Sequence, residues 1–135
     1  MIMNFLEETM IVMKEHNKSE SDVLFCELSR EGYWNDNNEW IEPTFQFPFS
    51  VFKANANFLY DNGFGGEEID TSLKIVFKDN SWMVRENYDG SEWWVYNKCP
   101  EFKEFCNAII IDFHNYYGDE YYKDDIANLL NKRVK

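Results

Sequence analysis

Apolar and polar residues alternate most regularly in the middle of the chain, where they predict three consecutive strands. The strands are expected over three segments of similar length: residues 73–78, 81–88 and 91–96. The dipeptides Asp79-Asn80 and Asp89-Gly90 separate them, and pairs of this kind favour two-residue hairpin turns. The pattern therefore predicts an antiparallel meander.

The two turns also predict the register of this meander. With two residues in each loop, Lys78 lies opposite Ser81 and Tyr88 lies opposite Ser91. One face is then almost wholly apolar, and we expect it to face the core: Leu73, Ile75, Phe77, Trp82, Val84, Trp93 and Val95. The other face is mixed: Lys74, Val76, Met83, Arg85, Asn87, Glu92, Trp94 and Tyr96. On it, Arg85 lies directly opposite Trp94.

Helical spacing is found on both sides of the meander. Asn4 is a predicted cap for a helix that ends near residues 16–17, with Glu7 three residues after the cap. Its apolar positions include Phe5, Leu6, Met10 and Met13. A second helix is predicted over residues 48–58, and its inward positions are Phe49, Phe52 and Ala56. A short strand over residues 23–28 would place Leu24, Cys26 and Leu28 on one face.

Two further helices are predicted at the C-terminal end. The first spans residues 100–117, with Pro100 at its start and Gly118 as its stop. The second begins at Asp119 and turns Tyr122, Ile126, Leu129 and Leu130 inward. We therefore expect one α+β domain over residues 1–135: a three- to four-stranded antiparallel meander packed by N-terminal and C-terminal helices.

Composition narrows the class of function. The net charge of −12 excludes a basic, sequence-reading DNA-binding protein, and the 19% of aromatic residues excludes an acidic disordered tail. The acidic excess is concentrated in residues 1–42, which hold 10 acidic and 3 basic side chains. The sequence shows no signal peptide and no apolar run long enough to cross a bilayer, and its three cysteines suggest no disulfide framework, so we expect a cytoplasmic protein.

No catalytic constellation is apparent in the sequence. His16 and His114 are far apart, and Cys26, Cys99 and Cys106 match no metal-ligand spacing. We therefore expect a protein that is not an enzyme and that needs no metal or cofactor.

Several groups of residues are candidates for binding a partner. Two are acidic clusters: Glu67, Glu68 and Asp70, and Asp119, Glu120, Asp124 and Asp125. Trp34 and Trp40 lie in residues 29–44, the segment with the weakest structural pattern. Arg85 and Trp94 are residue types enriched at interaction hot spots. Each group also has an alternative interpretation without a binding role. The acidic clusters can be ordinary solvated side chains, and the loop can fold both tryptophans into the core. Helices can cover the face that holds Arg85 and Trp94.

The segment Trp82-Met-Val-Arg85-Glu-Asn-Tyr88-Asp-Gly-Ser-Glu-Trp93-Trp94 carries a W-x-x-R-x-x-Y-D-G-S-E-W-W signature. It resembles small uncharacterised phage, prophage and mobile-element proteins of Firmicutes, over roughly residues 58–98. By analogy, small acidic phage proteins of this kind resemble inhibitors of host defence, including anti-CRISPR proteins.

The resemblance and the charge together lead to one functional expectation. We expect an inhibitor whose acidic, aromatic surface binds a basic nucleic-acid-handling host protein, such as a CRISPR effector. The alternative is an immunity protein or antitoxin that neutralises a basic nuclease toxin through the same electrostatics. Neither interpretation involves direct contact with nucleic acid or membrane.

Overall fold

The structure, a computed structural model, describes residues 1–105, 107 and 110–114 of the 135-residue chain. Its contacts divide the chain into two units, Met1–Cys99 and Pro100–Lys135. The expectation of one domain over the whole chain stays a prediction. All helices and strands given below belong to the first unit.

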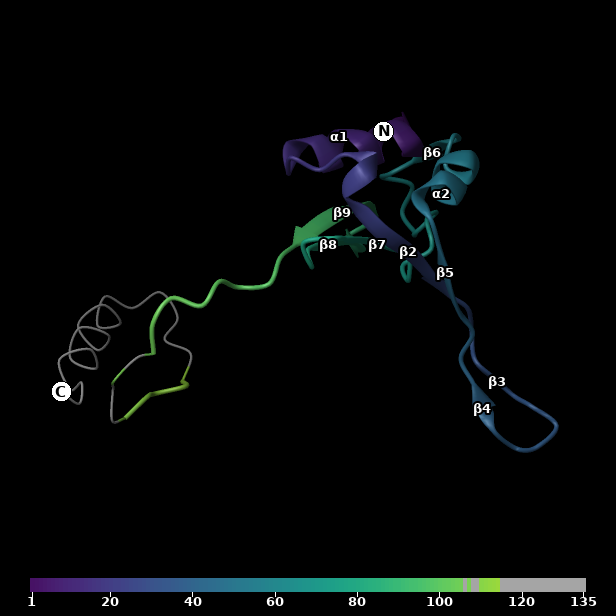
Figure 1. Cartoon of the computed structure of the whole chain (residues 1–135). Helices are drawn as coiled ribbons and strands as arrows, with labels where there is room; N and C mark the ends of the chain where they lie inside the picture. Colours follow the sequence, from purple (N-terminus) through teal and green to yellow (C-terminus); the bar gives the residue numbers. More distant parts are fainter. Residues whose placement is uncertain (106, 108–109, 115–135) are drawn as a thin grey trace. The chain divides into compact units, whose positions relative to one another are not determined.

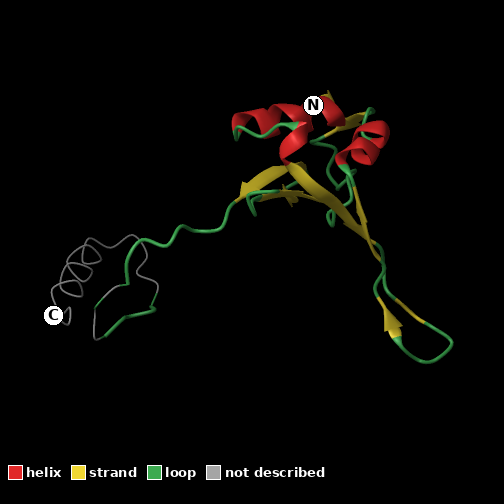
Figure 2. Ribbon diagram, viewed as in Figure 1, coloured by secondary structure: helices red, strands yellow, loops and turns green. Residues whose placement is uncertain are grey.

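The first unit is an antiparallel sheet with two helices packed on one side of it (Figures 1 and 2). The main sheet has the strand order β5-β2-β7-β8-β9. Its strands are β2 (Val23–Ser29), β5 (Thr44–Phe47), β7 (Lys74–Phe77), β8 (Trp82–Tyr88) and β9 (Ser91–Asn97). Two small ladders pair β1 (Ile2–Asn4) with β6 (Leu59–Asp61), and β3 (Tyr33–Trp34) with β4 (Trp40–Ile41). The α+β class is confirmed, but the main sheet has five strands where three or four were predicted, because β5 pairs with the outer edge of β2.

Both helices of this unit begin as the sequence predicts. Helix α1 (Phe5–Glu15) is capped by Asn4, whose side chain accepts a 3.0 Å hydrogen bond from the Glu7 amide. Helix α2 (Phe49–Asn55) follows Pro48 and is shorter than predicted. A single turn of 3-10 helix, η1 (Glu20–Asp22), leads from α1 into β2.

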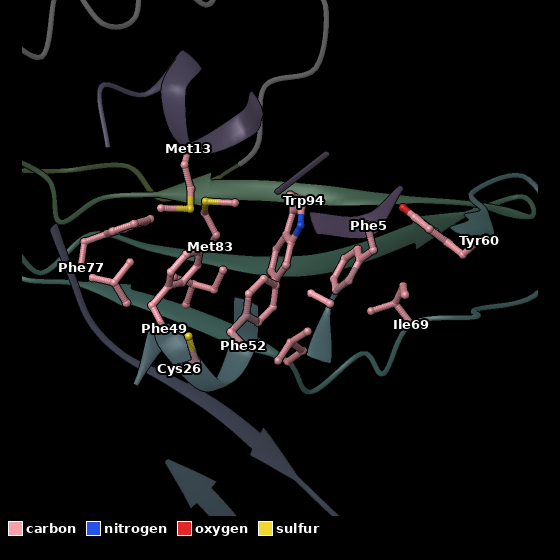
Figure 3. Packing of buried hydrophobic residues seen from close by; sticks show 14 residues of the cluster. Phe5, Met13, Cys26, Phe49, Phe52, Tyr60, Ile69, Phe77, Met83 and Trp94 are labelled. Atoms are coloured by element: carbon pink, nitrogen blue, oxygen red, sulfur yellow. The ribbon is translucent and has the colours of Figure 1, made fainter. Parts of the chain in front are cut away.

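The core lies between these helices and the sheet, and Figure 3 shows its largest side chains. Phe5 of α1 stacks on Trp94 of β9 with ring centroids 5.7 Å apart, and it also contacts Phe52 of α2. The inward positions predicted for α2 are buried, as is Met13 of α1. Met10 is an exception, since 37% of it is exposed.

The first turn of the meander differs from the prediction by one residue. The pair that closes the loop is Phe77 with Ser81, and the Phe77 amide donates to the Ser81 carbonyl at 2.8 Å. The loop therefore holds three residues and not two. Asn80 completes it in the left-handed conformation (φ 69°), as a three-residue hairpin loop requires. By contrast, Asp89 and Gly90 both have positive φ, and the second turn is the predicted two-residue one.

This one-residue difference exchanges the two faces of β8 and β9 relative to β7. Ile75 lies opposite Met83, and Arg85 lies opposite Trp94 as predicted, so all four side chains share the core face with Phe77. The expectation that Trp82 and Trp93 are buried beside Ile75 and Phe77 is wrong. They share the outer face with Val84 and Val95, and 38% of Trp93 is exposed.

A second irregularity changes the face of one residue in β2. The pairing of β2 with β7 shifts between Val23 and Phe25, which marks a β-bulge. Leu24 lies in this bulge and is 54% exposed, whereas Cys26 is buried as predicted.

The second unit carries no helix in its described part. Residues 101–105 and 110–114 have no regular secondary structure, which differs from the helix predicted over residues 100–117. Its described aromatic side chains are largely exposed, namely Phe102, Phe105 and Phe113. A helix gains most of its stability from packing of its apolar face, and these three side chains are 73–91% exposed. The predicted last helix lies outside the described residues.

Candidate interaction surface

Residues 30–43 form a projecting β arm and not the weakly structured loop that the sequence suggests. The ladder between β2 and β5 continues beyond Ser29 and Thr44, where the Arg30 amide donates to the Pro43 carbonyl at 2.9 Å. The pairing of β3 with β4 then extends the arm away from the helices (Figure 1). None of residues 30–43 is buried, so the arm holds its side chains outside the core.

The tip of the arm is ordered by Asn35. Its side-chain oxygen accepts from the amides of Asn37 and Glu39, each at 2.9 Å. Its backbone amide donates to the Glu39 carbonyl at 3.0 Å, and Asn38 adopts a left-handed conformation (φ 58°). The Asn-rich sequence therefore forms the turn that closes the hairpin, and this turn sets the position of the tryptophans.

Trp34 and Trp40 form a cross-strand pair on this arm. Their ring centroids are 5.3 Å apart at 66°, and 67% of Trp34 and 49% of Trp40 remain exposed. The alternative that both rings fill the core is wrong. The Trp40 indole donates to Glu42 at 2.9 Å, and a Cβ on Gly32 would lie 2.3 Å from its ring. Gly32 thus leaves the space in which the Trp40 ring lies.

The arm is also acidic. Residues 30–43 contain one cation, Arg30, and four carboxylates: Glu31, Asp36, Glu39 and Glu42. An exposed aromatic pair among carboxylates combines a large apolar contact area with a field that attracts cations.

The predicted acidic cluster Glu67, Glu68 and Asp70 lies next to the base of the arm. Asp70 pairs with Arg30 and accepts from the Ser72 hydroxyl at 2.6 Å. Burial raises the pKa of Asp70, but the hydrogen bonds from Ser72 and the charge of Arg30 outweigh it, so the net direction is downward. Glu68 accepts from the Asp61 amide at 2.8 Å. The structure therefore brings this cluster and the arm to one region of the molecule.

Arg85 and Trp94, by contrast, are buried beneath α1, each with 6% exposure. The covering of this face by a helix, weighed as the alternative, is the arrangement observed. The reason is the register of the first turn, which directs both side chains to the core. They are therefore removed from the candidate contact residues.

Arg85 lies at the centre of a buried ionic cluster. Its guanidinium donates to Glu8, Glu92 and Tyr60, at 3.1 Å in each case, and lies 5.0 Å from the centroid of the Trp94 ring. Tyr60 donates in turn to Glu8. Burial, followed by the hydrogen bond to Glu8, raises the pKa of Tyr60 well above its usual value. Arg85 Nε has no partner in the described part of the chain. These contacts join α1, β6, β8 and β9.

The remaining candidate residues are placed only in part. Asp119, Glu120, Asp124 and Asp125 lie outside the described residues, as does Cys106. Burial raises the pKa of the Cys26 thiol to about 12, which makes it a poor nucleophile, whereas Cys99 is exposed. His16 stacks on Tyr96, and His114 lies beside Asp112.

One feature was missed by the sequence analysis. A pocket of 560 Å³ opens between α2, β5 and the segment before β7, and it is named here the α2–β5 pocket. Its walls are mostly apolar: Phe5, Leu28, Phe45, Phe47, Val51, Phe52, Ala56, Phe58, Ile69 and Leu73. Phe45 and Phe47 alternate in the sequence as strand residues do, but the four-residue β5 was not predicted. That alternation is the signal that could have found β5, the strand that supplies one wall of the pocket.

Among the residues that the structure describes, no group of three His, Cys, Asp or Glu side chains is placed to hold a metal ion. In the same part of the chain, no helix has the length and apolar character needed to cross a bilayer. Comparisons with protein-family models, with curated proteins and with solved structures find no match to this chain.

Proposed function

We propose that this protein is a non-enzymatic inhibitor that binds a basic, nucleic-acid-handling protein of a bacterial host, in the manner of a phage anti-CRISPR protein. The observation that supports it is the exposed Trp34–Trp40 pair on an acidic projecting arm. Tryptophan is enriched among the residues that dominate binding energy, and it is most effective when a partner desolvates it. An exposed, ordered pair needs little further ordering on binding.

The charge of the arm determines the class of partner. Carboxylates around the tryptophans repel nucleic acid and attract a basic protein groove. Such grooves are built for phosphates, so the carboxylates would occupy the positions that phosphates use. The partner's access to nucleic acid is blocked as a consequence.

The same surface suits a second partner class. A nuclease toxin also has a basic groove, and a protein that fills it would be an immunity protein or antitoxin. The identity of the partner separates the two roles: a CRISPR effector indicates anti-defence, and a toxin encoded next to this chain indicates immunity.

The test uses the whole chain immobilised on a surface, with a purified CRISPR effector and a purified nuclease toxin as soluble analytes. Three proteins are compared: wild type, Trp34→Ala/Trp40→Ala and the control Tyr88→Ala. Tyr88 is a suitable control because it is an aromatic residue, 77% exposed, on β8, which does not pair with the two strands from which the arm projects.

The proposal predicts that one analyte binds wild type and the Tyr88 variant equally and binds the double variant at least tenfold more weakly. The same analyte should no longer bind nucleic acid when it is bound to wild type. Association should slow markedly between about 50 and about 300 mM salt, because screening shortens the range of steering. Binding that is unaffected by the double variant, or that leaves nucleic-acid binding intact, contradicts the proposal.

A finer variant tests the geometry of the tryptophan pair. Gly32→Ala retains both indoles but places a methyl group against the Trp40 ring. We expect binding between that of wild type and that of the double variant. An effect as small as that of Tyr88→Ala would mean that the position of Trp40 is unimportant.

A further inference from the structure

The α2–β5 pocket exposes several large apolar side chains in one place. Phe45, Val51 and Phe58 line it, and their exposed fractions are 54%, 44% and 42%. Single exposed apolar residues are ordinary, but three around one concave site are typical of a binding surface. Its volume of 560 Å³ lies within the range of pockets that hold ligands.

The mouth of this pocket is acidic. Arg30, Asn55, Glu68 and Asp70 supply its polar lining. A shallower depression formed by residues 67–71 is continuous with it, because the two share Glu68, Ile69 and Asp70. With Glu67 included, the apolar walls are surrounded by three carboxylates. The pocket lining contains one cation, Arg30, and this cation is already paired with Asp70. The surroundings therefore favour a ligand that is apolar at its centre and positive at its edges.

The pocket is also connected to the arm. Arg30 lines the pocket and begins the arm, while Phe45 belongs to the strand that follows the arm. A partner that binds the Trp34–Trp40 pair therefore has this pocket within the same region. A short segment of the same partner could occupy it.

We propose that the α2–β5 pocket is a second binding site for the same partner. The site takes one bulky apolar side chain of an exposed segment, flanked by lysine or arginine residues. The apolar side chain lies against Phe45, Val51 and Phe58, and the cations lie over Glu67, Glu68 and Asp70. This inference rests on the proposed function, since it names the chemistry of the segment that the partner contributes.

The test uses three short acetylated peptides with the central sequences Lys-Trp-Lys, Glu-Trp-Glu and Lys-Ala-Lys. Each is titrated into the ¹⁵N-labelled whole chain, and binding is followed residue by residue through amide chemical shifts. The variant Val51→Lys places a cation at the mouth of the pocket without disturbing a buried residue. Ile11→Lys on α1 is its matched control, because it is also an exposed aliphatic residue on a helix.

Lys-Trp-Lys should shift the amides around Phe45, Val51 and Phe58, and it should bind at least tenfold more tightly than either other peptide. Val51→Lys should weaken that binding at least tenfold, whereas Ile11→Lys should leave it within twofold. Shifts confined to the arm, or none at all, overturn the second site but leave the function of the arm unaffected. Equal binding of Glu-Trp-Glu overturns the assignment of a basic segment.

Discussion

Two regions of this molecule combine tryptophan with charge, and they have opposite environments. Around Arg85 and Trp94, the partners of the guanidinium are all buried, namely Glu8, Tyr60 and Glu92. Around Trp34 and Trp40, the rings are exposed and the carboxylates face solvent. Residue type alone does not separate an interaction site from a core, because tryptophan and arginine are suited to both. The backbone pairing decides which role they have.

The largest expected loss of stability comes from removing the cation of the buried ionic cluster. Arg85→Met removes the cation between Glu8 and Glu92 and leaves two buried carboxylates without it. Breaking a buried ionic group from one side costs about 3–5 kcal/mol of the free energy of unfolding, which chemical denaturation measures. The control Arg30→Met breaks an exposed pair and should cost less than about 1 kcal/mol. Equal losses in the two variants would contradict the contrast between the two regions.

The two regions should also respond differently to the same aromatic substitution. Trp94→Phe removes the indole that donates to Thr9 at 2.9 Å inside the core. We expect it to lower the free energy of unfolding by about 1–3 kcal/mol, since a buried polar partner is lost. Trp34→Phe on the arm should change it by less than about 0.5 kcal/mol. Denaturant midpoints of both variants measure the difference, and a Trp34→Phe loss as large as that of Trp94→Phe would place Trp34 in a structural role.

The register that separates the regions can be tested at the first turn. Asn80 has φ 69°, a conformation that glycine adopts easily and a β-branched residue does not. Asn80→Val should lower the free energy of unfolding by about 1–2 kcal/mol, and Asn80→Gly should leave it nearly unchanged. Thermal unfolding distinguishes them. If valine is tolerated as well as glycine, the three-residue loop is wrong.

The smallest expected effect is a dependence of stability on pH, which arises from Asp79 in the same turn. Hydrogen bonds from Lys18 and from Ser81 hold the pKa of Asp79 well below its usual range. A carboxylate with a lowered folded-state pKa stabilises the fold above its unfolded pKa of about 4, and that contribution is lost as the pH falls towards the folded-state pKa. Asp79→Asn should therefore be less stable than wild type at pH 7, and the two should converge in acid. Lys18→Met should behave similarly. A gap that stays constant down to pH 2 contradicts this coupling.

Much of the fold can be predicted from local pattern. The cap at Asn4, the start of α2 after Pro48 and the Asp89-Gly90 turn each depend on residues close together in the chain, and each is confirmed. The register predicted from the Asp79-Asn80 turn was wrong, because these two residues fit a two-residue loop as well as a three-residue loop. A shift of one residue exchanges every inward side chain of the next strand.

The candidate site was only partly predictable for the same reason. Trp34 and Trp40 could be singled out by their type and acidic surroundings, but their exposure depends on the pairing of residues 30–43. The α2–β5 pocket brings together Phe5, Phe45 and Ile69, which are distant in sequence. No local pattern contains such a site, since it exists only when the strand order is known.

The most direct test of the account is the dissociation rate of the partner from the arm. The complex of this protein with the proposed basic partner is formed at saturating concentration, and dissociation is followed for wild type, Trp34→Ala/Trp40→Ala and Tyr88→Ala. Loss of a hot-spot contact appears mainly in the dissociation rate. We expect dissociation at least tenfold faster for the double variant, with an unchanged melting temperature and no change for Tyr88→Ala. Equal dissociation rates for all three proteins would contradict the claim that the tryptophan arm is the binding site.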